Sequence, residues 1–428
     1  MHLRDFRKAG HTPTLFCAFL YFDVSFMIWV LIGALAVSIS GSFWPKPDGV
    51  ANDEYLRQIA PLKTLMVAVP LLGGSILRLV LGLLTDRIGA RRTGLIGMTL
   101  TAVPLLLGWL WADTLPQMLL VGLMLGVAGA SFAAALPLAS RWYPPQYQGL
   151  AMGIAGAGNS GTALATFFGP MLAVSLGWHA VFALALLPLA ATFVVYFFLA
   201  KDSPNQPAPK PLLDYAKVLG QADAWWFCLF YSVTFGGFVG LASFLNTFFK
   251  DQYFPNNAVM GGVYAGYFTT LCVFSGSLLR PIGGYLADRF GGVRMLLGLY
   301  FCTAAALLGL AFLPSVAMAL ALLFVVMGLL GMGNGSVFQL VPQRFRKEIG
   351  VMTGVVGAAG GIGGFFLPNL FGGMKWLTGS YGTGFAVFAG VSLLCVGLLW
   401  RLRAGWESTF LAPTMPAAEP VEMAVASN

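Results

Sequence analysis

Two arginines interrupt strongly apolar stretches of this 428-residue chain. Arg78 lies in "SILRLVLGLLTDRIGARR" (75–92), well before the terminal charge cluster, and Arg280 takes the same place about 202 residues later in "SLLRPIGGYLADRFGGVR". An arginine at the centre of a membrane helix costs about 2.5–3.5 kcal/mol by insertion scales, so keeping two of them indicates a functional requirement. Two guanidinium groups with almost no acid nearby suit a small planar oxyanion, which each planar fork can hold through two hydrogen bonds.

The competing interpretation, a structural ion pair, needs carboxylates inside the membrane. Asp23, in "LYFDVSFMIW", is the one acid that we expect within a span, because Asp86 and Asp288 fall at the surface. One acid cannot neutralise two arginines, so at least one arginine should face a hydrated site. Asp23 itself is interpreted as a salt-bridge or hydrogen-bond partner, and the alternative is a proton carrier in a proton-coupled symporter.

The elements that must position these side chains are transmembrane helices. The chain is 58% hydrophobic and only 9% charged, and its apolar stretches of roughly 20 residues recur along the whole length, which is long enough to cross a ~30 Å hydrocarbon core. We therefore expect an all-α membrane protein in the lipid bilayer. The twelve predicted spans are 14–40, 61–84, 93–112, 116–139, 147–173, 179–200, 223–249, 259–286, 294–312, 315–341, 349–375 and 381–402.

Lysine and arginine predict the orientation of these spans. With the N-terminus in the cytoplasm, 17 of the 24 basic residues lie on the cytoplasmic side and 5 on the other, and the remaining two are Arg78 and Arg280. This bias places both termini in the cytoplasm of an inner-membrane protein. It also accounts for the net charge of +8, so no nucleic-acid partner is needed.

The same spans divide the chain into two halves. We expect an N-terminal six-helix bundle (1–200), a cytoplasmic linker rich in proline and charge (201–222), a C-terminal six-helix bundle (223–403) and a disordered cytoplasmic tail (404–428). The five cysteines, in apolar spans without paired spacing, are interpreted as packing residues, neither disulfides nor metal ligands.

An internal repeat supports the division into halves. At the same offset as the two arginines, the motif after each of these helices repeats with its glycines, aspartate and arginines. Glycine permits close helix contact, the aspartate can accept hydrogen bonds from a neighbouring helix end, and the arginines stay at the surface. The motif residues are Gly82, Asp86, Arg87, Gly89 and Arg92, then Gly284, Asp288, Arg289, Gly291 and Arg294. Their expected role is gating and orientation; a purely topological positive cluster is the alternative.

A second repeat is rich in glycine. "GIAGAGNSGTALATFFGP" (153–170) matches "GVVGAAGGIGGFFLPNLFG" (354–372), and the small residues at helical spacing allow neighbouring backbones to approach closely. These glycines are Gly153, Gly156, Gly158, Gly161, Gly354, Gly357, Gly360, Gly361 and Gly364. The first repeat carries an amide, Asn159, at a position where the second repeat has Gly360 or Gly361. Asn159 offers donors and an acceptor to a small oxyanion at midplane depth.

These motifs resemble a known family. "GLLTDRIGARR" and "GGYLADRFGGVR" are similar to the cytoplasmic loop motif of the major facilitator superfamily, and the paired glycine-rich stretches together with the two arginines resemble the nitrate/nitrite porter family within it. The resemblance implies the major facilitator fold, with Arg78 and Arg280 binding the anion and Asn159 hydrogen-bonding it. It further implies site roles for Tyr231, Phe235 and Phe132; helix lining is the alternative for these aromatic residues.

The sequence thus predicts a secondary transporter of nitrate, nitrite or both, working by alternating access. Nitrate/proton symport and nitrate/nitrite exchange both stay open, as do uptake of another small anion and a non-transporting nitrate sensor. A membrane enzyme is disfavoured, because His2, His11 and His179 form no constellation with other chemical groups. We expect the protein to act as a monomer and to need no cofactor or metal.

Overall fold

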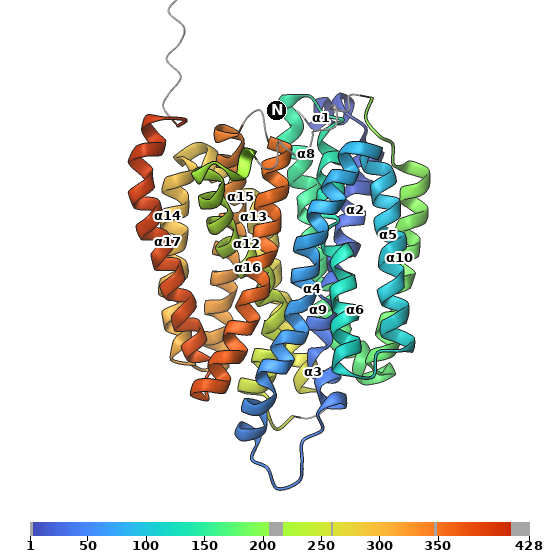
Figure 1. Ribbon diagram of the computed structural model, residues 1–428, viewed down its shortest axis with the longest axis vertical. Coiled ribbons are helices and arrows are strands. Elements are labelled where there is room, and N and C mark those ends of the chain that lie inside the picture. Colours follow the sequence, from blue (N-terminus) through green and yellow to red (C-terminus); the bar gives the residue numbers. More distant parts are fainter. Residues whose placement is uncertain (1–2, 205–216, 258–259, 346–348, 412–428) are drawn as a thin grey trace, which may run out of the picture.

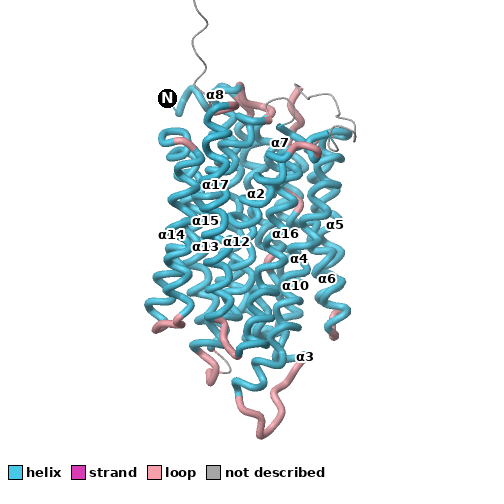
Figure 2. The backbone as a smooth tube through the Cα atoms, turned by 60° about the vertical axis from the view of Figure 1, so that its left-hand side comes forward, coloured by secondary structure: helices cyan, strands magenta, loops and turns pink. Residues whose placement is uncertain are grey.

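The computed structural model describes residues 3–204, 217–257, 260–345 and 349–411. The described part is helical, and its helices form two bundles that stand side by side, as Figures 1 and 2 show. The N-terminus and the C-terminal end of the last described helix lie at the same end of the molecule (Figure 1). We call this the proximal end, and the opposite end, which carries the loop between Phe43 and Asn52, the distal end. The predicted all-α fold is confirmed.

The first bundle contains the elements up to residue 199. They are α1 (Leu3–Ala9), α2 (Thr12–Trp29), α3 (Leu31–Phe43), α4 (Asn52–Ile88), α5 (Ala90–Leu110), α6 (Leu115–Gly129), α7 (Phe132–Ser140), α8 (Pro145–Gly156), the 3₁₀ helix η1 (Ala157–Ser160), α9 (Gly161–Leu176) and α10 (Trp178–Leu199).

The second bundle contains six long helices. They are α12 (Ala222–Tyr253), α13 (Gly261–Phe290), α14 (Gly292–Ala311), α15 (Val316–Arg344), α16 (Ile349–Thr378) and α17 (Gly382–Ser408). The last of these continues beyond Arg403 into the segment expected as a tail. The rest of that tail, and most of the expected linker, lie outside the described residues.

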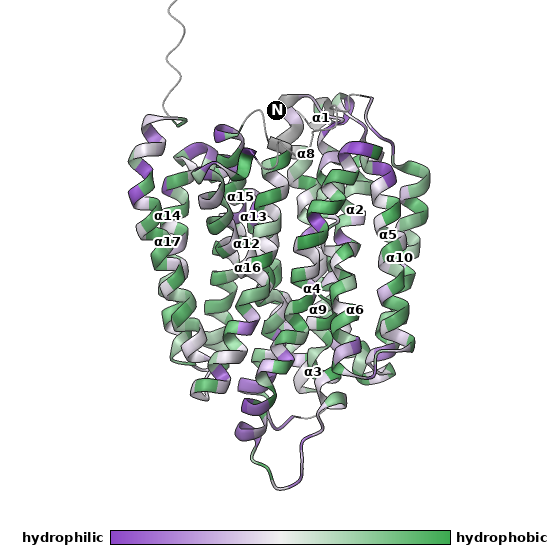
Figure 3. Ribbon diagram, in the orientation of Figure 1, coloured by the Kyte–Doolittle hydropathy of each residue, from purple (hydrophilic) through white to green (hydrophobic). Residues whose placement is uncertain are grey.

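Eleven helical stretches in the described residues are long and apolar enough to cross a membrane. The predicted fifth span, 147–173, is present as α8, η1 and α9 in succession. Figure 3 shows hydrophobic residues along the middle of the helices and polar residues gathered toward the two ends. Large apolar side chains such as Phe198, Phe312 and Trp400 are exposed on the outside of the bundles, which fits a surface that faces lipid.

The two halves differ in the continuity of three helices. In the first half, the first, fourth and fifth spans are interrupted at Val30, at Ala130–Ser131 and at η1, whereas α12, α15 and α16 run without a break. Non-helical backbone at membrane depth is tolerated where it is buried in protein or lines a polar site. The interruptions therefore direct attention to the region between the halves.

Two glycines of the repeated motif terminate helices. Gly89 and Gly291 end α4 and α13 with φ of +92° and +88°. Residues with a Cβ rarely adopt this conformation, so glycine at these positions allows each long helix to turn sharply into the next.

Candidate functional site

Arg78 lies between the two bundles. Its side chain is buried at 1% exposure, and both of its terminal nitrogens donate to backbone carbonyls: Nη1 to Gly357 at 2.5 Å and Nη2 to Gly129 at 2.8 Å. Gly357 belongs to α16 of the second half and Gly129 to α6 of the first. Arg78 thus joins the halves without any carboxylate partner among the described residues, and its Nε is unpaired there.

The interruption between α6 and α7 explains how Gly129 can accept this bond. In a continuous helix the Ala133 N–H would donate to the Gly129 carbonyl. Here the Ala133 N–H donates to Ala130 at 3.0 Å, so the carbonyl of Gly129 is left for the guanidinium. Backbone dipoles therefore stabilise the buried charge without neutralising it, which keeps an anion attractive at this place.

Aromatic rings surround the Arg78 guanidinium. Its Cζ lies 5.2 Å from the ring centroid of Phe132, 5.3 Å from that of Phe235 and 5.8 Å from that of Trp29. Tyr231 stacks on Phe235 with centroids 5.1 Å apart. The structure brings Arg78, Phe132, Phe235 and Tyr231 together, and rings at this distance stabilise a desolvated guanidinium.

Trp29 and Phe338 belong to the same cluster and were missed from the sequence. The Trp29 indole N–H donates to the Pro70 carbonyl at 2.7 Å, and this fixes the ring beside Arg78. Phe338 contacts Phe132 at 6.0 Å and Tyr231 at 4.8 Å, so it closes the cluster from α15. In a chain with 35 phenylalanines and 11 tryptophans, composition alone cannot select these two.

Arg280 faces the same region from α13. Arg280 lies close enough to Arg78 for electrostatic repulsion, and the hydroxyl of Tyr231 is within electrostatic reach of both guanidinium groups. Within the described chain, Arg280 Nη1 and the Tyr231 hydroxyl are buried without a hydrogen-bond partner. Donors left unpaired beside a like charge favour an anion between them.

Asn159 is buried on η1, and neither its Oδ1 nor its Nδ2 has a partner in the described part of the chain. The 3₁₀ turn packs on α2 and α13. Asp23, on α2, accepts a hydrogen bond from the Ser160 hydroxyl at 2.8 Å, directly beside Asn159 in the chain. Asp23 thus holds the turn that carries Asn159, and the described residues place it in no ion pair.

The glycines of the glycine-rich repeats fall into two groups, according to whether a Cβ at their position would meet a neighbouring atom. A Cβ on Gly161 would meet the Asp23 carbonyl at 1.8 Å, and one on Gly361 would meet Ser75 Oγ at 2.2 Å. Gly158, Gly357, Gly360 and Gly364 also face close neighbours, whereas Gly153, Gly156 and Gly354 have nothing within 4 Å. Close helix approach therefore explains six of the nine positions.

The two copies of the surface motif are not equivalent. Asp86 pairs with Arg141 at 2.7 Å, next to the end of α7, whereas Asp288 is exposed. A Cβ on Gly82 would lie 3.9 Å from the Ala133 side chain, and a Cβ on Gly335 would lie 2.6 Å from the backbone nitrogen of Gly284. The remaining arginines are near the proximal ends of α4 and α13 or the starts of α5 and α14: Arg87, Arg92, Arg289 and Arg294.

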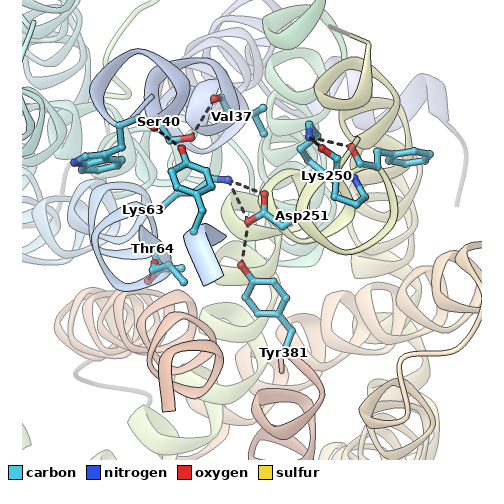
Figure 4. Close-up of polar contacts among 12 residues, drawn as sticks. Val37, Ser40, Lys63, Thr64, Lys250, Asp251 and Tyr381 are labelled. Carbon is cyan, nitrogen blue, oxygen red and sulfur yellow. Dashed lines mark hydrogen bonds and ion pairs between the residues drawn. The ribbon is translucent and has the colours of Figure 1, made fainter. Parts of the chain in front are cut away.

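A second buried charge cluster lies toward the distal end. Lys63 of α4 donates to Asp251 of α12 at 2.9 and 3.2 Å, with side-chain exposures of 3% and 4%. The Tyr381 hydroxyl donates to the same carboxylate at 3.1 Å, and Figure 4 shows the three side chains converging. Asp251 falls beyond the predicted span 223–249, so Asp23 is not the only buried acid. That part of the sequence-based account was wrong because α12 continues to Tyr253.

Other polar contacts between the halves lie on the same side. Asn246 donates to the Ala34 carbonyl at 2.6 Å, and Arg57 donates to Trp376 and Leu377 at 2.6 and 3.2 Å. The Thr166 and Thr270 hydroxyls are 2.8 Å apart. Among the described residues, the hydrogen bonds between the halves therefore run from Arg78 to the distal end. These contacts hold the two halves together toward that end.

The histidines and cysteines hold no metal-like arrangement in the described ranges. His11 accepts a hydrogen bond from the Thr14 N–H at 3.2 Å and caps α2, and burial together with nearby Lys201 lowers the pKa of His11. His179 contacts Asp113 at 3.2 Å at the surface. The five cysteines are Cys17, Cys228, Cys272, Cys302 and Cys395, and all are free thiols.

Comparisons with known proteins agree with this architecture. The family model described as the Major Facilitator Superfamily matches residues 14–368. The "Nitrite extrusion protein" of Bacillus subtilis is 32% identical over 384 residues, covering 88% of this chain and 92% of that protein. The "Probable nitrate/nitrite antiporter NarK1" of Thermus thermophilus is 31% identical, and the match covers 83% of this chain and 84% of that protein. The "Probable nitrate/nitrite transporter NarK2" of Mycobacterium tuberculosis is 34% identical, covering 85% and 89%.

Solved structures resemble the chain in fold. The xylose transporter XylE from E. coli, in a partially occluded inward open conformation, superposes with a TM-score of 0.69 at 14% identity, covering 92% of this chain and 99% of that one. The human organic anion transporter MFSD10 gives 0.70 at 16% identity, covering 91% and 99%. At such low identity the likeness concerns the fold alone.

Proposed function

The chain belongs to the nitrate/nitrite porter family of the Major Facilitator Superfamily, and from this premise we propose that it carries nitrate, nitrite or both across a membrane by alternating access. Its membership in a transporter family makes it a transporter and not an enzyme. The observation that supports the anion site most strongly is Arg78, a fully buried guanidinium whose only polar partners among the described residues are backbone carbonyls.

In this proposal the anion lies between Arg78 and Arg280. The free Nη1 of Arg280, the Tyr231 hydroxyl and the Asn159 amide donate to its oxygens, and Phe132 and Phe235 cover its faces. A planar, weakly hydrated anion suits this combination of flat rings and in-plane donors. A bulkier tetrahedral or strongly hydrated anion suits it less, because its hydration would be lost against aromatic faces.

Transport then follows from rocking one half against the other around this site. The ion pair of Lys63 and Asp251 keeps the distal end closed, so we assign the present structure to the state that opens toward the proximal end. We propose that this end faces the cytoplasm of an inner membrane, in keeping with the excess of lysine and arginine expected there. The protein acts as a monomer, with 1–200 and 223–403 as the two moving bundles and 201–222 as their linker.

We propose nitrate/nitrite exchange as the mode of coupling. Arg78 and Arg280 repel each other and have no carboxylate partner among the described residues, so the empty site is costly to occlude and an anion lowers that cost. Exchange needs no titratable group. Asp23 already accepts a hydrogen bond from Ser160 and is accounted for by holding η1; proton symport through Asp23 is the alternative that the experiments below separate.

The test of this function is uptake of labelled nitrate into proteoliposomes that contain the purified protein. We expect uptake that saturates with nitrate, is inhibited by unlabelled nitrate and nitrite, and is weakly affected by sulfate or phosphate. Binding of nitrate without any uptake or exchange would favour the sensor. Equal inhibition by chloride, sulfate and nitrate would reject the planar-oxyanion site.

A further inference from the structure

Asn334, on α15, is an amide without an assigned role. Its side chain is completely buried, and in the described chain neither Oδ1 nor Nδ2 has a hydrogen-bond partner. A buried donor or acceptor left unpaired is destabilising, because it has given up its hydrogen bonds to water without replacing them. Among the described asparagines only Asn159 shares this property on both polar atoms, and Asn159 is the amide that the proposed function assigns to the anion site.

The chain neighbours of Asn334 show where it lies. A Cβ on Gly333 would approach the Thr234 methyl at 2.6 Å, and a Cβ on Gly335 would approach the Arg280 carbonyl at 2.6 Å. Asn334 therefore lies where α15 meets α12 and α13. Phe338 is one helical turn further on, on the same face, and its ring contacts Tyr231 at 4.8 Å. That face of α15 looks toward the anion site.

Four more unpaired polar groups come from the two neighbouring helices. Tyr231 and Thr234 lie one turn apart on α12, and Ser277 and Arg280 lie one turn apart on α13. The hydroxyls of the first three and Nη1 of Arg280 are all buried without a partner in the described chain. With Asn334 they form a polar cluster from three helices of the second half, and no carboxylate of the described residues pairs with any of them.

The internal repeat gives an independent reason for this placement. In the first half, Gly126 packs against the backbone of Gly73 and Gly74, and Gly129, one turn later, accepts a hydrogen bond from Arg78. In the second half, Gly331 packs in the same way against Gly276. The residue one turn after Gly331 is Asn334, beside Arg280. Where the first half presents a backbone carbonyl to its arginine, the second half presents an amide.

We propose that Asn334 is an anion-binding residue of the second half and the functional counterpart of Asn159, an inference that rests on the proposed function. Its Oδ1 accepts from a donor of the cluster, which orients the amide, and its Nδ2 donates to an oxygen of the bound nitrate or nitrite. The site then has one arginine and one amide from each half. This arrangement presents comparable hydrogen-bond donors to the anion from both halves. It suits a substrate that both halves must bind and release during transport.

The experiment measures nitrate binding by calorimetry to purified full-length protein in lipid nanodiscs. Asn334→Leu keeps the side-chain volume and removes the amide, and Asn334→Asp keeps the shape and replaces the donor by a negative charge. We expect Kd for nitrate to rise about 10- to 100-fold in Asn334→Leu, since a hydrogen bond to a charged group is worth about 1.5–3 kcal/mol. No nitrate binding is expected for Asn334→Asp.

The matched control is Asn369→Ala on α16. Asn369 is half-buried and its Nδ2 is already bound to the Phe365 carbonyl of its own helix, so its replacement should change Kd less than twofold. If Asn334→Leu does not fold, Asn334→Ser, which is smaller and keeps a hydroxyl donor, gives the second measurement, with an intermediate Kd expected.

Two outcomes separate this inference from the proposed function. If the wild-type protein binds no nitrate, the proposed function itself fails. If the wild-type protein binds nitrate and the folded Asn334→Leu and Asn334→Ser variants bind it equally well, the proposed function stands and Asn334 is not a ligand. Retained binding by Asn334→Asp would overturn the inference in the same way.

Discussion

At the scale of single residues, the two arginines are equivalent in sequence and different in structure. Arg78 is fixed by two backbone carbonyls and three aromatic rings, whereas Arg280 is half-buried and keeps Nη1 free. The sequence could predict that both lie within apolar helices and why that is informative. It could not predict the difference, because the Gly129 carbonyl becomes available only through the interruption between α6 and α7.

This difference predicts distinct effects of Arg78→Lys and Arg280→Lys. Lysine cannot reproduce the planar fork, so nitrate transport should fall at least about tenfold in both variants. Only Arg78→Lys should also lower the melting temperature, since it loses hydrogen bonds to both halves. Transport assays and thermal unfolding measure the two effects, with Arg403→Lys at an exposed i,i+4 pair as control. Normal transport by both variants would refute direct binding.

Asp23 gives a second prediction at this scale. In Asp23→Asn, the amide Oδ1 can still accept the hydrogen bond from Ser160, so the 3₁₀ turn and Asn159 stay in place. Nitrate/nitrite exchange should therefore continue within about twofold of the wild type at pH 6 and at pH 8. The alternative, proton symport through Asp23, predicts uptake that no longer responds to a proton gradient in this variant.

At the scale of elements, the sequence predicted the helices well and their irregularities poorly. Apolar length and the internal repeat are enough to locate the spans. The interruptions at Val30, Ala130–Ser131 and η1 depend on tertiary contacts, such as the Trp29 ring against Gly129 and Gly74, which no local pattern reveals. Asn334 is a different case: an amide in a glycine-rich apolar run is the same feature that identified Asn159.

The glycine-rich helix α16 yields a prediction with a built-in control. In Gly361→Ala the new methyl group would lie 2.2 Å from Ser75 Oγ of the other half, whereas in Gly354→Ala it would meet nothing within 4 Å. We expect Gly361→Ala to slow transport severalfold by forcing α4 and α16 apart. Gly354→Ala should transport normally and be stabilised by up to about 1 kcal/mol. Equal transport by the two variants would contradict the role given to close packing.

At the scale of the whole molecule, the two bundles meet at Arg78 and at polar contacts toward the distal end. The sequence analysis proposed two bundles with an anion site between them, but its predicted span 223–249 ended before Asp251, so the pairing of Asp251 with Lys63 was not expected. The missing element was the continuation of α12 to Tyr253, because the predicted span 61–84 already included Lys63. Contacts between the halves decide the conformational state. They join residues far apart in the sequence, so the periodicity of apolar residues could not predict them.

The ion pair of Lys63 and Asp251 predicts a change in conformational populations when one charge is removed. Asp251→Asn or Lys63→Met leaves the partner buried and uncompensated, which is strongly destabilising, so the distal end should open. Spin labels at exposed Asp53 and Asn256, in a Cys302→Ser background, should report a longer distance in both single variants. The double variant Lys63→Met/Asp251→Leu should restore the wild-type distance. An unchanged distance in Asp251→Asn would show that the pair does not keep the distal end closed.

The central claim is that a bound anion lets the two halves rock over the paired arginines. The most direct measurement is uptake of labelled nitrate into proteoliposomes held at zero proton gradient and zero membrane potential, with either nitrite or no transported anion inside. Our account predicts rapid uptake into nitrite-loaded vesicles and uptake at least about tenfold slower into vesicles without nitrite. Uptake that is indifferent to internal nitrite and that appears only when a proton gradient is imposed would contradict it.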